Sequence, residues 1–200
     1  VAAPKIAARR KAGQFVIVRI DEYGERIPLT IADADPERGT ITLVVQAVGK
    51  STAQMATLRP GDRLLDVVGP LGAPTHIERV GTVAVVAGGI GIAPAHPIAQ
   101  AFRAAGNTVI AILGARSKDL MIMEDEMRQA ADEVLVCTDD GSYGCPGLVT
   151  HVLADLIATR GKPDQVFAVG PVPMMKYVSL LTREHGIPTM VSLNPIMMDG

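Results

Sequence analysis

The sequence predicts a chain of class β + α/β, with an antiparallel β-barrel followed by a five-stranded parallel α/β domain. From Gln14 to about Pro70, short strands alternate with turns and there is little helix, which is typical of a small barrel. Past Gly72 the strands become continuous apolar runs, as expected for strands buried on both faces of a parallel sheet. Segments of helical periodicity separate these runs, and the alternation indicates right-handed crossovers in a doubly wound sheet.

The first half reads as strands separated by turns. The segment Phe15–Ile20 is rich in β-branched residues and ends at a polar turn, and the segment RIPLTIAD (Arg26–Asp33) begins the next strand. The Pro and Gly of the turn at Arg59–Asp62 preset its backbone angles. The other elements expected here are a strand over Thr40–Val48, a helix over Ser51–Leu58 capped by Ser51 or Thr52, and a strand over Leu64–Val68.

The second half alternates strands and helices, and the two halves meet within Leu71–Gly81, which holds Gly, Pro, His and charged residues. We therefore expect one domain over residues 1–75 and a second over residues 76–200. The expected strands are Thr82–Ala87, Thr108–Leu113, Glu133–Thr138, Gln165–Val169 and Thr189–Leu193. The expected helices are Ala95–Ala104, Ile122–Ala131, Leu148–Thr159 and Val172–Glu184.

Composition excludes several classes of function. The net charge of -2 lacks the basic excess of a nucleic-acid-binding protein. Two cysteines are too few for a disulfide framework or a four-ligand metal site, so we expect no metal site and a reducing, cytoplasmic setting. The longest apolar stretch is broken by glycines and falls short of the roughly 20 residues of a membrane span, and no signal-peptide pattern opens the chain. We expect a soluble protein.

A glycine loop is the strongest local signal. The run VAVVAGGIGIAP passes from a buried strand into Gly88, Gly89 and Gly91, and leaves through Pro94 into a helical pattern. Such strand-to-helix loops bring backbone N–H groups against a phosphate. The loop is neither the Rossmann fingerprint nor a P-loop, and the alternative is a tight turn without a ligand. Because three glycines cost backbone entropy that a plain turn need not spend, phosphate binding is favoured.

Three further loops follow strands of the α/β half, where ligands of such sheets bind. Arg116 could reach an adenosine ribose or its 2′-phosphate, or it could be an ordinary exposed arginine. Two adjacent acidic residues follow the third strand, but no third metal ligand lies near them in sequence, so a loop with Asx-type turns that lines the cleft is preferred. The agreement of four such loops predicts a single nucleotide cleft. These three loops contribute Gly114, Ala115 and Arg116; Asp139 and Asp140; and Gly170 and Pro171.

The β half offers a second set of candidate ligands. The guanidinium of Arg26 suits a pyrophosphate, and the hydroxyl of Thr30 can donate to a ring nitrogen. Gly49, Lys50, Ser51 and Thr52 lie where a strand gives way to a helix, another place for phosphate oxygens. From these residues alone, an unliganded barrel loop is at least as good an interpretation.

No acid–base machinery is visible. The four histidines are scattered, and no Ser-His-Asp set or pair of catalytic carboxylates is present. This absence is consistent with hydride chemistry, in which the cofactors react and the protein positions them.

The order of motifs over nearly the whole chain resembles the ferredoxin–NADP reductase superfamily. Within it, the likeness is greatest to two electron-transfer subunits, the small subunit of NADH-dependent ferredoxin:NADP oxidoreductase and the sulfide dehydrogenase small subunit. The dihydroorotate dehydrogenase electron-transfer subunit is more distant, and the closing VSLNPIMMDG looks like the first two. The motifs, in order, are RIPLTIAD, VVQAVGKST, GPLG, VVAGGIGIAP, GARS, TDDGSYG and VGP.

The resemblance implies a flavin-dependent NAD(P)H oxidoreductase subunit, with FAD in the barrel and a nicotinamide nucleotide in the second domain. Hydride would pass between nicotinamide C4 and flavin N5 across the domain interface. Contacts to the flavin and its phosphates would come from Arg26, Pro28, Leu29 and Thr30, with Thr30 as the catalytic candidate, and from Gly49, Lys50, Ser51 and Thr52 at the pyrophosphate. The nucleotide would lie on Gly88, Gly89, Gly91, Pro94, Gly114, Ala115, Arg116, Asp139, Asp140, Gly170 and Pro171.

Two departures from the family pattern stand out. Many members carry Cys before the Gly-Pro of the fourth strand, where this chain has Val169, so no thiol can assist hydride transfer there. The electron-transfer subunits hold a [2Fe–2S] cluster on cysteines that follow the MxDG segment, whereas this sequence stops at Gly200; Cys137 and Cys145 are too few to replace those ligands.

The implied partners are a larger subunit carrying a second flavin and iron–sulfur centres, in a heterodimer, and ferredoxin or a similar carrier. The choice between NADH and NADPH stays open. One alternative is a relay of the dihydroorotate dehydrogenase type. The other is a nucleotide-sensing module that has kept the fold and lost the flavin.

Overall fold

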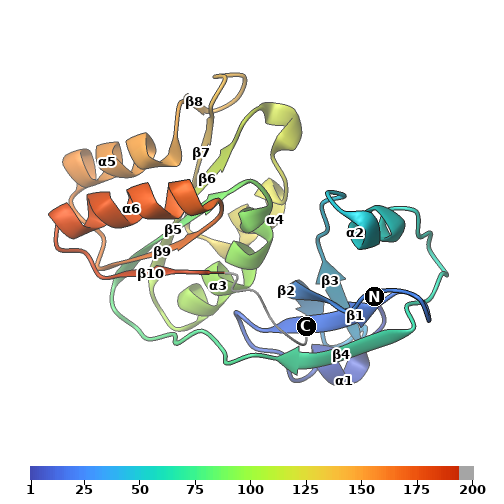
Figure 1. Ribbon diagram of the computed structural model, residues 1–200. Helices are drawn as coiled ribbons and strands as arrows, with labels where there is room; N and C mark the ends of the chain where they lie inside the picture. Colours follow the sequence, from blue (N-terminus) through green and yellow to red (C-terminus); the bar gives the residue numbers. More distant parts are fainter. Residues whose placement is uncertain (194–200) are drawn as a thin grey trace. The chain divides into compact units, whose positions relative to one another are not determined.

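The computed structural model describes residues 1–193, and the chain divides into two compact units (Figure 1). The first unit runs from Val1 to Thr75, and the second begins at His76. The expected MxDG segment at the end of the chain lies outside the described residues. No helix among residues 1–193 is long and apolar enough to cross a membrane.

The first unit is built on a four-stranded antiparallel sheet of order β3-β2-β1-β4 (Figure 1). Burial alternates along β1, where Val16 and Val18 are fully buried between partly exposed neighbours, as expected for a sheet with one covered face. Ile31 and Ile41 complete this core together with residues of a short helix, α1, that the sequence did not indicate. The elements are α1 (Pro4–Ala7), β1 (Phe15–Arg19), β2 (Ile27–Asp35), β3 (Thr40–Leu43), α2 (Lys50–Met55) and β4 (Asp66–Leu71).

Strand β3 is shorter than the predicted Thr40–Val48. It pairs with β2 only as far as Leu43, opposite Ile31, and the part of β2 before Ile31 is paired with β1 alone. Residues 44–48 have no partner strand within residues 1–193, and Val48 is exposed. An apolar, β-branched run is therefore not sufficient for a strand when no ladder partner is available.

The second unit is a doubly wound sheet of order β10-β9-β5-β6-β7-β8 (Figure 1). Five strands match the predicted ones, and the sixth, β8, is a two-residue edge strand that the sequence did not indicate. The strands are β5 (Thr82–Gly88), β6 (Thr108–Ala115), β7 (Glu133–Thr138), β8 (Cys145–Pro146), β9 (Gln165–Val169) and β10 (Thr189–Val191). The helices are η1 (Gly89–Gly91), α3 (Ile92–Ala104), η2 (Lys118–Leu120), α4 (Glu124–Ala130), α5 (Val149–Arg160) and α6 (Val172–Glu184).

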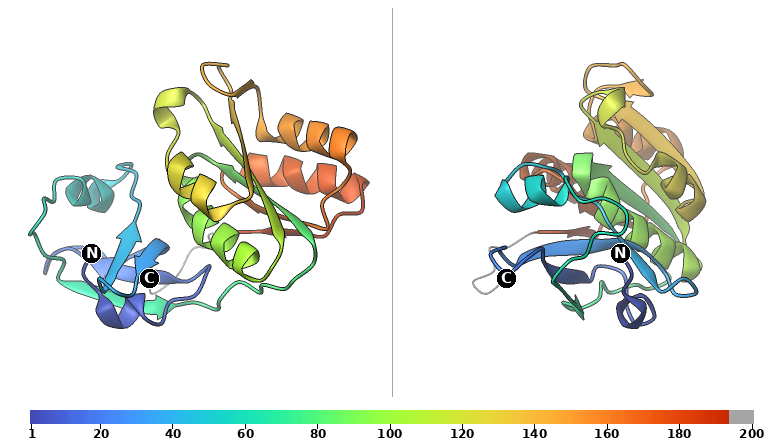
Figure 2. Two further views of the ribbon diagram at one scale, coloured as in Figure 1. Left: turned by 180° about the vertical axis from the view of Figure 1, so that it is seen from behind. Right: turned by 90° about the vertical axis from the view of Figure 1, so that its right-hand side faces the viewer.

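Helices α3 and α4 cover one face of this sheet, and α5 and α6 cover the other (Figure 2). Every residue of β5 from Val83 to Ala87 is fully buried, which explains its uninterrupted apolar sequence. Helix α3 begins three residues before the predicted start. Pro94 lies in its first turn, where a missing N–H breaks no hydrogen bond within the helix.

The strand order contains a switch point. Strand β5 lies between β6, the next strand in sequence, and β9, which comes later in the chain. The chain therefore crosses from β5 to β6 on one side of β5 and later returns to β9 on the other side. The carboxyl ends of β5 and β9 lie side by side. In open α/β sheets, this is the position at which ligands bind.

The side chain of Asn107 anchors residues 78–81, the segment that leads into β5. Its buried side chain accepts hydrogen bonds from the N–H groups of Val80 (2.7 Å) and Gly81 (3.0 Å), and donates to the carbonyls of Glu78 and Phe102, both at 2.9 Å. We expect Asn107→Ala to lower the free energy of unfolding by about 2 kcal/mol, because buried backbone groups lose their partners. Denaturant titration measures this loss.

The matched control is Lys162→Ala, which changes an exposed coil residue of the same unit. It is expected to leave the unfolding midpoint unchanged. An Asn107→Ala protein as stable as this control would show that the four hydrogen bonds contribute little.

Candidate functional site

Three glycines bring the ends of β5 and β9 together at the switch point. A Cβ on Gly91 would lie 2.5 Å from the carbonyl oxygen of Val169, and one on Gly170 would lie 3.1 Å from the backbone N and O of Gly88. A Cβ on Gly88 would meet Sδ of Met174 at 2.5 Å. These glycines are therefore needed for close packing of the backbone, whatever the loop binds.

Gly89 has a different role from its neighbours. Its φ is +56°, in the left-handed region, and an added Cβ would meet no atom of the described residues within 4 Å. The backbone conformation at this position favours glycine, and the space beside its Cα is open. No side chain caps helix α3, which starts directly after this turn. A phosphate can approach the backbone at Gly89 without displacing a side chain.

The loops after β6 and β7 form the adjoining rim. They are joined through their backbones, because the N–H of Asp139 donates to the carbonyl of Ala115 (3.0 Å) and that of Asp140 to the carbonyl of Arg116 (3.1 Å). Those N–H groups are thus unavailable to a ligand, while the side chains of Arg116, Asp139 and Asp140 are exposed. Gly114 lies one residue deeper, where a Cβ would strike Val149 of α5 at 2.4 Å.

The loop after β7 combines the expected Asx-type turn with longer-range contacts that the sequence did not indicate. Asp140 accepts from the N–H (2.9 Å) and hydroxyl (2.6 Å) of Ser142, and these bonds lower the pKa of Asp140. The Ser142 hydroxyl in turn accepts from the N–H of Lys118 (2.9 Å). Tyr143 lies under the Lys118 ammonium and donates to Glu124 (3.1 Å). Asp140 and Ser142 are only two residues apart, but Ser142 and Lys118 are 24 apart and Tyr143 and Glu124 are 19 apart, so no local pattern could reveal those two contacts.

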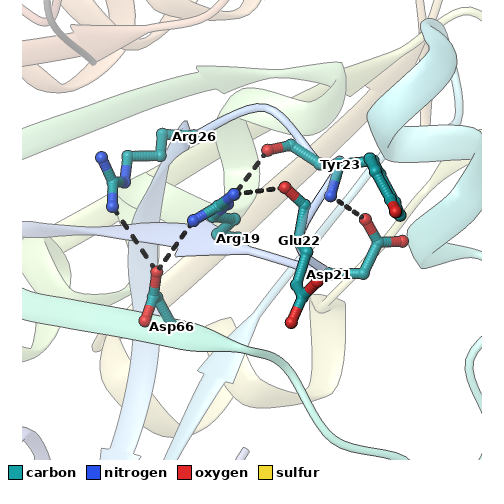
Figure 3. A network of polar contacts seen from close by, with 7 residues as sticks. Arg19, Asp21, Glu22, Tyr23, Arg26 and Asp66 are labelled. Carbon is teal, nitrogen blue, oxygen red and sulfur yellow. Dashed lines mark hydrogen bonds and ion pairs between the residues drawn. The ribbon is translucent and has the colours of Figure 1, made fainter.

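In the first unit, Arg26 is the most accessible cation of a small cluster (Figure 3). Its side chain is 59% exposed, with one guanidinium nitrogen 3.7 Å from Asp66. Arg19 is 28% exposed, lies 4.0 Å from the same carboxylate and donates to the carbonyls of Glu22 and Gly24. Arg19 therefore holds the turn, whereas Arg26 keeps donors free for an anionic ligand.

The residues after Arg26 do not share one face. Pro28 and Thr30 stand opposite Ile17 and Phe15 of β1, and neither is fully buried. Leu29 projects to the other side, against the core of the unit. A ligand that lies over Pro28 and Thr30 can therefore meet Leu29 only through its backbone.

Helix α2 is tied to the turn before Arg26. Ser51 donates to Glu25 (2.8 Å), and Gln54 donates to Asp21 (2.6 Å), which lowers the pKa of Asp21. These bonds place the predicted residues Gly49–Thr52 beside the segment that carries Arg26, although residues 44–48 before them are not a strand.

The hydroxyls of α2 are already engaged by the protein. Thr52 accepts from the N–H groups of Val48 (3.1 Å) and Gly49 (2.9 Å), and Ser51 is held by Glu25. Lys50 is exposed and forms no ion pair within residues 1–193. Among the predicted residues of this unit, Lys50 and Arg26 are thus the exposed cations available to a pyrophosphate.

The described residues contain no group of three or more His, Cys, Asp or Glu side chains that could hold a metal ion. The donors present therefore do not fit an iron–sulfur cluster. Two surface depressions of the second unit, of about 390 and 190 Å³, contain none of the predicted residues. The larger lies along α6 and β10, and the smaller lies beside α5.

Burial raises the pKa of the Cys137 thiol to about 11, with a smaller contribution from Cys145. An unfolded thiol titrates near pH 8.5, so the folded state retains the proton that the unfolded state loses. The stability from this group is complete below about pH 8.5 and is lost as the pH rises towards 11. We expect the unfolding midpoint to fall more between pH 8 and pH 10.5 in the wild type than in Cys137→Ala. Equal falls would contradict the assignment.

Comparison with known proteins places this geometry in a family. Residues 85–180 match the family model described as the oxidoreductase NAD-binding domain. The electron transfer subunit homolog of dihydroorotate dehydrogenase B from Thermotoga maritima is 50% identical over 99% of this chain and 70% of its own length. The chain belongs to the electron-transfer subunits of the ferredoxin–NADP reductase superfamily.

Other relatives of this electron-transfer subunit agree. The dihydroorotate dehydrogenase B electron transfer subunit of Fusobacterium nucleatum is 36% identical over 88% of this chain and 70% of its own. A solved NADH-dependent reduced ferredoxin–NADP oxidoreductase chain superposes with a TM-score of 0.92 at 47% identity, over 98% of this chain and 71% of that one. An Amycolatopsis cytochrome P450 reductase shares the fold, with a TM-score of 0.73 at 20% identity, 91% of this chain and 60% of that one.

The predicted fold class, a barrel followed by an α/β domain, is thereby confirmed, and the chain is an oxidoreductase subunit of ferredoxin–NADP reductase type. The individual ligand contacts of the predicted residues stay predictions.

Proposed function

We propose that this chain is a cytoplasmic FAD-containing subunit that takes electrons from, or returns them to, NAD(P)H. It exchanges them with a larger flavin and iron–sulfur subunit of the ferredoxin:NAD(P) oxidoreductase or sulfide dehydrogenase type, and through that partner with ferredoxin or a similar carrier. The likeness to the NADH-dependent ferredoxin–NADP oxidoreductase chain, at 47% identity and TM-score 0.92, carries the proposal.

The residues of the second unit bind and orient the nucleotide. The backbone at Gly89 and the uncapped start of α3 receive the pyrophosphate at the switch point, with Gly88, Gly91, Pro94, Gly170 and Pro171 shaping the approach. Arg116, Asp139 and Asp140 line the rim on which the adenosine half lies. Gly114 and Ala115 are small, so no bulky side chain of these two residues blocks the approach of the ligand to that rim. Because these contacts are mainly backbone contacts, they position the ligand without acid–base chemistry.

The residues of the first unit hold the flavin. Arg26 and Lys50 neutralise its pyrophosphate beside Gly49, Ser51 and Thr52, and Pro28 and Thr30 present one face of β2 to the ring. The Thr30 hydroxyl donates to a ring nitrogen and thereby orients it. When bound, the two cofactors supply the hydride chemistry themselves.

The purified protein tests the proposal directly. We expect a yellow sample whose flavin absorbance is bleached by NADH or NADPH under anaerobic conditions, and whose flavin, released by denaturation, is FAD. The reduction rates with the two nucleotides identify the preferred one. A colourless sample that still binds nucleotide would instead support the nucleotide-sensing module without flavin.

A second candidate is a dihydroorotate dehydrogenase relay, which the names of the relatives at 50% and 36% identity favour. The complex purified through a tag on this chain separates the two. Reduction of NADP by NADH and reduced ferredoxin supports the first candidate. NAD reduction that depends on dihydroorotate supports the second and overturns the first.

A further inference from the structure

The two cysteines of this chain lie opposite each other on neighbouring strands. Cys137 of β7 and Cys145 of β8 are register partners in the parallel pair, although they are eight positions apart in sequence. Parallel strands run about 4.8 Å apart, which is within the Cα separation of about 4.4–6.8 Å that a disulfide spans.

Both side chains face helix α5. Cys137 packs in the core cluster with Val149 and Val152 of that helix, and its Sγ lies 3.6 Å from the Cβ position of Gly114. Cys145 lines the 190 Å³ depression together with Val152 and His151 of the same helix. Register and surroundings therefore agree that the two thiols lie on the same face of the sheet.

The two thiols differ in access. Cys137 is 1% exposed, and burial holds its pKa at about 11, so it stays protonated and shielded. Cys145 is exposed in a two-residue edge strand. An edge strand this short can move the small distance by which a disulfide draws the two Cβ atoms together.

We propose that Cys137 and Cys145 form a redox-active dithiol that hydrogen peroxide converts to an intrachain disulfide at the base of the loop after β7. The Cys145 thiol gives its proton to solvent, the thiolate attacks one peroxide oxygen and the O–O bond breaks. Cys145 sulfenic acid forms, and the departing hydroxide takes up a proton from solvent to give one water. The Cys137 sulfur then attacks the sulfenic sulfur; the S–O bond breaks, and the hydroxyl leaves with the Cys137 proton as a second water. The two sulfurs lose two electrons in total, and the peroxide gains two.

This site is independent of the proposed function, because neither thiol belongs to the residues assigned to the cofactors. The disulfide would join the two ends of the loop that carries Asp139, Asp140 and Ser142. Its formation can be followed whether or not nucleotide binds.

Mass spectrometry of the protein as purified tests the proposal. After removal of reductant and treatment with peroxide, we expect the thiol titre to fall from two per chain to none in the monomer, with a mass about 2 Da lower. No Lys or Arg lies between residues 129 and 159, so trypsin leaves both cysteines in one peptide. Cleavage before Asp139 or Asp140 should then give two fragments that separate only after reduction.

Cys145→Ser is the variant expected to fold, because residue 145 is exposed. In it, Cys137 should stay reduced at the peroxide dose that oxidises the wild type fully. Oxidation of Cys137 at the wild-type rate in this variant would overturn the assigned order of attack. Wild-type protein in which Cys145 gains one to three oxygen atoms while Cys137 stays a thiol, or which forms disulfides between chains, would overturn the site itself.

Discussion

Arg26→Ala is expected to weaken FAD binding by about 10- to 100-fold, because it removes a charge-assisted contact worth roughly 1.5–3 kcal/mol. Arg26 is 59% exposed, and its partner within the described part of the chain is a single carboxylate at 3.7 Å. Its loss should therefore change the free energy of unfolding of the flavin-free protein by no more than about 0.5 kcal/mol. Flavin fluorescence titration of the apoprotein measures the affinity, and denaturant unfolding measures the stability.

Two variants sharpen this test. Arg38→Ala removes an equally charged side chain from the same unit, one that pairs with Asp35 across a turn and is 84% exposed. It should leave FAD affinity unchanged. Arg26→Lys keeps the charge but loses the planar fork, so an affinity between those of wild type and alanine is expected. Unaltered FAD affinity in Arg26→Ala would remove Arg26 from the flavin site.

Gly91→Ala is expected to lower the free energy of unfolding by about 3 kcal/mol or more and to abolish nucleotide binding. The φ of Gly91 is −62°, which alanine adopts freely, so the cost is purely steric. The added Cβ would lie 2.5 Å from the carbonyl oxygen of Val169 and 2.9 Å from Cα of Gly170. Since backbone cannot rotate away as a side chain can, the ends of β5 and β9 would have to separate. Thermal unfolding and NADH titration report the two losses.

Gly89→Ala is the matched control, two residues earlier in the same loop. Its Cβ would meet nothing within 4 Å, and only the positive φ of +56° penalises it, by about 1–2 kcal/mol. The protein should stay folded. Weaker nucleotide binding in this folded variant would locate the phosphate at the open backbone, whereas full affinity would place it elsewhere. A Gly91→Ala protein as stable as Gly89→Ala would contradict the steric account of the switch point.

The elements that were predicted most accurately are those whose signal is local. Strands β7 and β9 and helix α6 have the predicted bounds, because a strand buried on both faces needs apolar residues throughout, and a surface helix repeats every 3.6 residues. The misses depend on contacts distant in sequence. Residues 44–48 have the composition of a strand but no partner, and β8 has no strand signal yet pairs with β7.

The candidate site shows the same division. Loops at the carboxyl ends of strands could be found from the sequence, because glycine, proline and adjacent acids interrupt apolar runs there. The role of each residue could not. Gly91 is required by the backbone of Val169, Ser142 is held by Lys118, and Leu29 turns to the core while its neighbours do not. Each of these facts depends on a partner or a face that side-chain pattern alone leaves undetermined.

By itself, the sequence determined the class of fold, the division into a β half and an α/β half, and the loops at the carboxyl ends of the strands, because periodicity and turn chemistry are properties of neighbouring residues. Only the tertiary structure decided which strands are neighbours, and hence that Gly88 and Gly170 meet between β5 and β9. Strand order is set by how helices and strands that are distant in sequence pack together, so no short stretch of sequence determines it.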